Sequence, residues 1–134
     1  MNAKLTLAAR LLLGFIMFAA GLAGLLNLIP APTDLPERLV TFNTGLMASI
    51  YFMPLLKITE TVCGALLLSG YFVPLALVVL APIVINILLV HTFLAPSGLP
   101  VAIIVAGLTV YLSFFSEKYS GTIKQLFKMN NSTN

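Results

Sequence analysis

Residues 72–94 read FVPLALVVLAPIVINILLVHTFL, a stretch without a single lysine, arginine, aspartate or glutamate. A helix needs about 20 predominantly apolar residues to cross the hydrocarbon core of a bilayer. This stretch meets that requirement, so it predicts a transmembrane helix over about residues 72–95.

The composition of the whole chain also indicates a membrane protein, with lipid as its surroundings. Of its 134 residues, 60% are hydrophobic and 8% are charged, and the mean hydropathy is +1.08. A soluble domain is about 45–50% apolar and about 25% charged. The excess of apolar side chains therefore requires lipid. The net charge of +3 comes from basic residues that gather near the two ends without interleaved aromatic residues, so nucleic acid is not expected as a partner.

Three further apolar stretches lie on either side of the first. They predict spans over about residues 5–29, 46–70 and 99–116. The N-terminal span ends where prolines at 30 and 32 stop a helix. The links on both sides of the 72–95 span are only a few residues long, which favours antiparallel hairpins. The predicted fold is thus all-α, an integral membrane four-helix bundle that forms a single domain over residues 1–134.

The link before the second span is longer and mixes charged with apolar residues. We expect a short amphipathic helix over about residues 35–50, lying on the membrane surface. Pro54 offers a second interpretation, in which the true crossing begins there and is short, about 54–70. The sequence alone leaves the start of this span open.

The basic residues predict the orientation of the bundle. Lys4 and Arg10 open the first span and three lysines follow the last, whereas the links on the opposite side offer only Arg38. Both termini, including the tail at 117–134, are therefore expected in the cytoplasm. A cleaved signal peptide is the alternative for the first stretch, but its apolar run after Arg10 is longer than usual for one.

Polar side chains inside the predicted spans are the candidate functional residues. A charged group in a span costs at least about 2.5–3.5 kcal/mol on insertion scales, so its presence suggests a function. The second span contains the ionisable residues Lys57 and Glu60. The third contains the ionisable His91 and a strongly polar amide, Asn86.

Spacing predicts that these residues share a pocket. Lys57 and Glu60 are one helical turn apart and can form an ion pair. Counted outward from the turn at Tyr71 at about 1.5 Å per residue, Glu60 and Asn86 differ in height by about 6 Å, and His91 lies about 7–8 Å beyond Asn86. The structural alternatives are a pair that serves stability alone, a Lys57 that reaches the interface, and an interfacial His91 bonded to a carbonyl or to lipid.

Cysteine and metal chemistry are limited by residue count. Cys63 is the sole cysteine, so an intrachain disulfide, a dithiol redox pair and a cysteine-based metal cage are excluded, and no metal site is expected. No recognisable nucleophile or cofactor motif appears, and no catalytic residue can be assigned.

The middle hairpin resembles the DoxX family of small four-span membrane proteins. The resemblance lies in PLLK at 54–57, Glu60, GALLL at 64–68, VPLAL at 73–77, Ala81-Pro82, NIL at 86–88 and HTFL at 91–94. It implies a four-helix bundle in the cytoplasmic (inner) membrane of a bacterium, with Lys57, Glu60, Asn86 and His91 at recurrent polar positions. Members of the family have been linked to quinone-dependent oxidation of sulfur compounds and to membrane oxidoreductase complexes.

Two functions from different classes follow as hypotheses. The first is an auxiliary subunit of a membrane redox system, or a binder of a small apolar molecule such as a quinone in the intramembrane polar pocket. The second is a small transport or proton-relay module that uses Glu60 and His91. Whether the chain is an enzyme stays open; an activity, if present, is expected to be oxidoreductase-associated. The expected partners are the lipid bilayer, membrane oxidoreductase subunits and a second copy of the chain.

Overall fold

A computed structural model describes residues 2–28 and 34–128 of the chain. Within those ranges every regular element is a helix, and four helical segments are long and apolar enough to cross a membrane: Ala3–Leu26, Phe52–Ser69, Val73–Phe93 and Pro96–Phe115. The prediction of an all-α membrane protein with four spans is confirmed.

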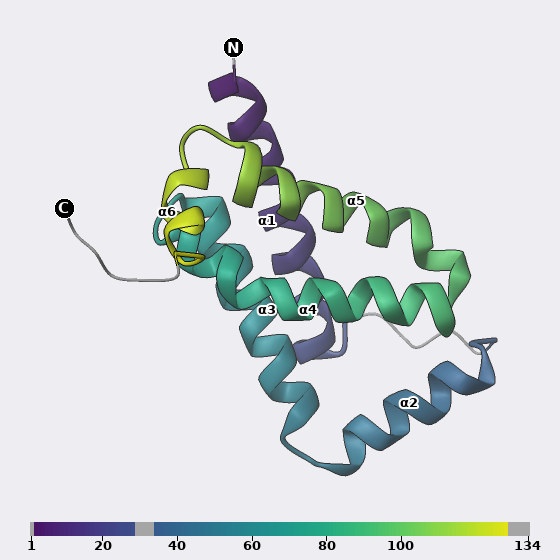
Figure 1. The fold of residues 1–134 in the computed structure, drawn as a ribbon. Coiled ribbons are helices and arrows are strands. Elements are labelled where there is room, and N and C mark those ends of the chain that lie inside the picture. The colour runs from purple at the N-terminus through teal and green to yellow at the C-terminus, as the bar shows by residue number, and fades with distance from the viewer. Residues whose placement is uncertain (1, 29–33, 129–134) are drawn as a thin grey trace.

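The elements follow one another as antiparallel spans (Figure 1). Short turns join the last three spans, whereas the helix α2 lies between the first and the second. The first three spans are α1, α3 and α4. The fourth is built from three consecutive pieces, the 3-10 turn η1, α5 and a π-helical turn η2, and the short helix α6 follows it. Their bounds are α1 Asn2–Leu26, α3 Phe52–Ser69, α4 Val73–Phe93, η1 Pro96–Gly98, α5 Leu99–Val110, η2 Tyr111–Phe115 and α6 Ser120–Gln125.

The second span is shorter than the predicted range of 46–70. A separate helix, α2, ends at Ala48 and α3 begins at Phe52, so the continuous helix expected across this region is wrong and the shorter interpretation is close. The chain breaks because Ile50 adopts a left-handed conformation with φ of 73°. The Ser49 hydroxyl stabilises the break: it donates to the Leu46 carbonyl at 2.8 Å and accepts the Phe52 N–H at 3.0 Å.

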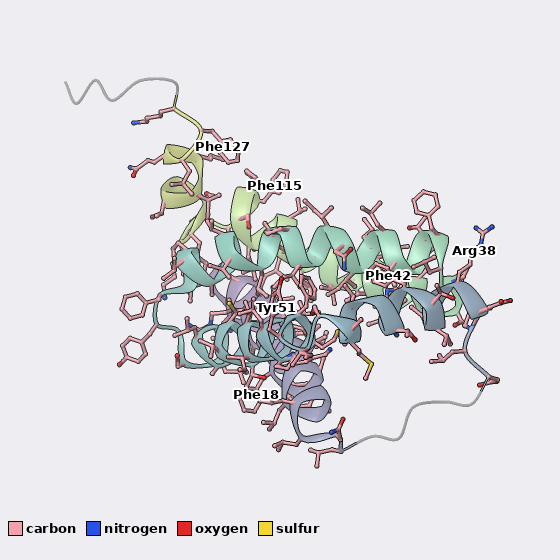
Figure 2. All side chains as sticks on the ribbon, turned by 90° about the horizontal axis from the view of Figure 1, so that it is seen from below. Phe18, Arg38, Phe42, Tyr51, Phe115 and Phe127 are labelled. Atoms are coloured by element: carbon pink, nitrogen blue, oxygen red, sulfur yellow. The ribbon has the colours of Figure 1, made fainter. Side chains whose placement is uncertain are left out.

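Helix α2, Glu37–Ala48, corresponds to the amphipathic helix predicted over 35–50. None of its residues is buried, and its contacts are with α3. It projects away from the other helices, and Arg38 points outward near its first turn (Figure 2). That α2 rests on a membrane surface stays a prediction.

The turn between α3 and α4 is tight, as its length predicts. Gly70, with φ of 84°, ends α3 and Phe72, with φ of 54°, precedes α4. Glycine is the residue that adopts the left-handed region without steric cost. Pro74 lies in the first turn of α4, where its missing N–H leaves no bond unmade.

Glycines bring α1 and α3 into the closest contact of the bundle. A Cβ atom added to Gly64 would lie 2.7 Å from the Cα of Phe18, and one added to Gly21 would lie 2.6 Å from the backbone nitrogen of Thr61. Small residues let backbones approach this closely, which is how helices gain packing energy in lipid. Gly14 makes a similar approach, since a Cβ atom there would lie 3.0 Å from the backbone nitrogen of Leu68.

The buried core lies near the α3–α4 turn. The buried residues of α4 run from Val73, its first residue, to Val84, and those of α3 run from Glu60, near its middle, to Leu67, close to its end. Away from the turn, α3 and α4 diverge (Figure 1). We call the end that carries this turn, the start of α1 and α6 the hairpin end, and the opposite end the α2 end.

Candidate functional site

The ion pair predicted in the second span is present. Lys57 Nζ and Glu60 Oε1 lie 3.5 Å apart, one helical turn from each other on α3. The side chain of Glu60 is 5% exposed and that of Lys57 is 24% exposed. The carboxylate is therefore covered by protein, whereas the ammonium keeps access to the surroundings of the bundle.

Helix α1 forms the wall against which this pair lies. A Cβ atom at Gly24 would lie 2.7 Å from Cδ and from Cε of Lys57, so the lysine stem runs over that glycine. One turn earlier, Gly21 packs on Thr61, whose hydroxyl donates to the Lys57 carbonyl at 2.7 Å. The glycines thus give a long charged side chain room between two helices, which larger residues would fill.

Asn86 lies on the exposed face of α4, away from the buried core. It is exposed, two residues beyond the buried Val84, which turns its side chain by more than half a turn of helix away from the core. Within residues 2–28 and 34–128 no hydrogen bond joins it to Glu60. Counting residues gives height along a helix but not rotation about its axis, which is why a similar depth did not bring the two together.

His91 is held at the turn between α4 and the fourth span. Its Nδ1 lies 2.8 Å from the Ile87 carbonyl oxygen. A carbonyl only accepts, so Nδ1 carries the proton and Nε2 is the free acceptor of the neutral ring. A Cβ atom at Gly98 would lie 2.5 Å from Nε2, so the Cδ2–Nε2 edge of the ring packs against that glycine. The bond to a carbonyl is the one that the structural alternative for His91 expects, and its place at a membrane interface stays a prediction.

A second polar cluster, which the sequence did not reveal, lies at the hairpin end. The hydroxyls of Thr6 and Tyr111 are 3.1 Å apart and join α1 to η2. Ser116 is fully buried; its hydroxyl donates to the Leu112 carbonyl at 2.6 Å and accepts the Tyr119 N–H at 3.3 Å. Thr6 and Tyr111 are 105 residues apart, so no local pattern marks them as neighbours.

A cavity of about 330 Å³ opens in this cluster, and we call it the Arg10 cavity. One wall comes from the first turns of α1 and the other from the segment between η2 and α6. The lining residues are Ala3, Thr6, Leu7, Arg10, Glu117, Lys118 and Tyr119. Arg10 lies in an apolar run, and that signal could have singled it out as more than a marker of orientation.

An apolar groove of about 430 Å³ lies on the outside of the fourth span. Its walls come from α4, α5 and η2, and Phe115 marks its hairpin-end limit (Figure 2). Its lining residues are Leu88, Ile103, Ala106, Gly107, Val110, Tyr111 and Phe115. Such a surface is suited to acyl chains of the bilayer.

These features define a class: a multi-pass, all-helical membrane protein with four spans and a buried ion pair in the second. The family model DoxX matches residues 5–95, from α1 through α4, and the chain belongs to the DoxX family. Neither curated proteins nor solved structures gave a match to it. The matched range contains the Lys57–Glu60 pair and Arg10, while α5, η2 and α6 lie beyond it.

Proposed function

We propose that this DoxX-family protein binds a small apolar molecule with a polar head, of the quinone class, beside Lys57 and Glu60, and that it serves a membrane redox system as an auxiliary subunit. The observation that carries the proposal is the buried carboxylate of Glu60 paired at 3.5 Å with a partly accessible Lys57 inside a span. A charged pair in lipid is costly to keep, so a role beyond packing accounts for it best.

The chemistry of the pair fits such a head group. The Lys57 ammonium carries N–H donors for a carbonyl oxygen, and the Glu60 carboxylate is an acceptor for a hydroxyl. A quinone, when bound, would supply two-electron redox chemistry; the residues of this chain would hold and orient its head group.

The proton-relay hypothesis has less support. It needs Glu60 and His91 to exchange protons, yet Nδ1 of His91 is bonded to the carbonyl of Ile87 on its own helix. Glu60 and His91 lie in the α2-end halves of helices that diverge toward that end. No specific observation favours this function over the first.

The test is purification in mild detergent followed by an absorption spectrum and mass spectrometry of the bound small molecules. We expect a quinone to copurify with the parent protein and to be lost from the variant that carries both Lys57→Met and Glu60→Gln. A control variant, Lys124→Gln, removes an exposed charge on α6 and should retain the quinone. Equal quinone content in all three proteins, or none in any, would reject the proposal.

A further inference from the structure

The Arg10 cavity is large enough for a polyatomic group. Its volume of about 330 Å³ compares with about 30 Å³ for one water molecule in the liquid. Its walls differ in chemistry. Helix α1 contributes Ala3, Leu7 and the Thr6 hydroxyl, and the opposite segment contributes charged side chains and Tyr119.

Arg10 lines the cavity, and its side chain also holds an unused hydrogen-bond donor. Its Nε is buried, and within the described part of the chain it has no hydrogen-bond partner. Leaving such a donor unpaired costs about 1–3 kcal/mol. The guanidinium packs on Gly70 at the end of α3, in the space that a Cβ atom would occupy.

The charges around the cavity favour an anion. Among the described residues that line it, Arg10 and Lys118 are the cations and Glu117 is the one carboxylate. The same end of the bundle carries three more basic residues on α1, α6 and the residues just after it: Lys4, Lys124 and Lys128. An anion that enters would meet a positive field with a single opposing charge, that of Glu117.

The position of the cavity indicates what carries the anion. Its walls are the first turns of α1 and the residues that directly follow the fourth span, Pro96–Phe115, so it lies where spans end and lipid head groups begin. Leu7, in the cavity wall, is 48% exposed and can contact an acyl chain. Arginine presents its donors in a planar fork that matches phosphate oxygens.

From these observations we propose that the Arg10 cavity binds the phosphate group of an anionic membrane lipid. The site is separate from the Lys57–Glu60 pair and does not depend on the proposed function. Free phosphate shares the same chemistry, so the experiment separates the two sources.

The experiment measures thermal unfolding of the detergent-solubilised full chain by circular dichroism. Four probes are titrated: phosphatidylglycerol, diacylglycerol as a lipid without phosphate, glycerol phosphate and inorganic phosphate. Phosphatidylglycerol should raise the unfolding temperature in a saturable manner, and the other three should not. A rise with the soluble phosphates equal to that with the lipid would reject the lipid source. No saturable rise with any phosphate-bearing probe would reject the site.

Variants assign the effect to the cavity. Arg10→Gln should weaken the binding of phosphatidylglycerol, so that the half-saturating concentration rises by about tenfold or more, as expected for one lost charged hydrogen bond. Lys118→Gln should weaken the binding less, and Glu117→Gln should strengthen the binding, because the opposing charge is gone. The matched control, Lys124→Gln, removes an exposed basic residue of the same end outside the cavity and should respond as the parent does.

Arg10 also neighbours the end of α3, so its loss could unfold the protein. Arg10→Lys keeps the charge there but loses the planar fork, and it should fold and bind the lipid more weakly than the parent. Were Arg10→Lys, Lys118→Gln and Glu117→Gln all to respond as the parent does, the cavity would not be the lipid site and the proposal would fail.

Discussion

At the scale of single residues, the two members of the ion pair are not equivalent. Glu60 is almost fully covered, and Lys57 retains about a quarter of its exposure. Removing the positive partner leaves a covered carboxylate without compensation, whereas removing the negative partner leaves an ammonium that can move outward along Gly24. The loss of Lys57 should therefore reduce the stability of the protein more than the loss of Glu60 does.

A double-mutant cycle tests this asymmetry. Lys57→Met should lower the free energy of unfolding by about 3 kcal/mol, the low end for breaking a buried pair, and Glu60→Gln should lower it by less. Combining both substitutions should recover most of the loss, since no orphaned charge remains. Chemical denaturation in detergent measures all four proteins. Additive losses in the double variant would mean that the two side chains do not interact.

At the scale of elements, the seam between α1 and α3 organises the bundle. Gly64 of α3 packs against the backbone of α1 at Phe18, and Gly14 and Gly21 of α1 pack against α3. Each close approach depends on the absence of a Cβ atom, so the seam has little tolerance for added volume. By contrast, Gly107 of α5 has no atom within 4 Å of an added Cβ.

A pair of identical substitutions compares the two environments. Gly64→Ala should cost about 1–3 kcal/mol of stability, because the new methyl group would press on the backbone of α1. Gly107→Ala should leave stability unchanged or raise it by up to about 1 kcal/mol, since alanine favours the helix and meets open space. Thermal unfolding of both variants in one detergent checks this. Equal losses at the two sites would contradict the close packing of α1 on α3.

At the scale of the whole molecule, charge is divided unequally between the two ends. The hairpin end carries Lys4, Arg10, Lys118, Lys124 and Lys128 against Glu117, whereas the links of the α2 end carry Arg38 against Asp34 and Glu37. Basic residues near spans stay on the cytoplasmic side during insertion. The hairpin end is therefore predicted to face the cytoplasm.

Cysteine labelling tests this orientation. In a background in which Cys63 is replaced by alanine, Lys4→Cys and Lys124→Cys should react with a membrane-impermeant thiol reagent only after the cells are opened. Thr44→Cys, an exposed position on α2, should react in intact cells. Labelling of either hairpin-end cysteine from outside, with Thr44→Cys protected, would reverse the orientation.

Apolar run length and turn length were enough to predict four spans, their antiparallel order and the Lys57–Glu60 pair, because each depends on residues near in sequence. The sequence also suggested α2, but the break at Ile50 depends on a single backbone angle that no residue pattern marks. Asn86 was misplaced relative to the pair because rotation about α4 is set by packing of the whole bundle. The Arg10 cavity was missed because its two walls come from opposite ends of the chain.

The seam between α1 and α3 also bears on how the chain is made. Helix α3 has the lowest mean hydropathy of the four spans, because it carries two charges. A lysine raises the cost of leaving the translocon for lipid, by about 2.5–3.5 kcal/mol at the centre of a span and by less toward its end, where Lys57 lies. Helix α1 is synthesised first and presents Gly21 and Gly24, the positions over which Thr61 and the Lys57 stem later lie. We therefore expect the first span to assist the insertion of the second, so that the order of synthesis becomes part of the information that the sequence carries.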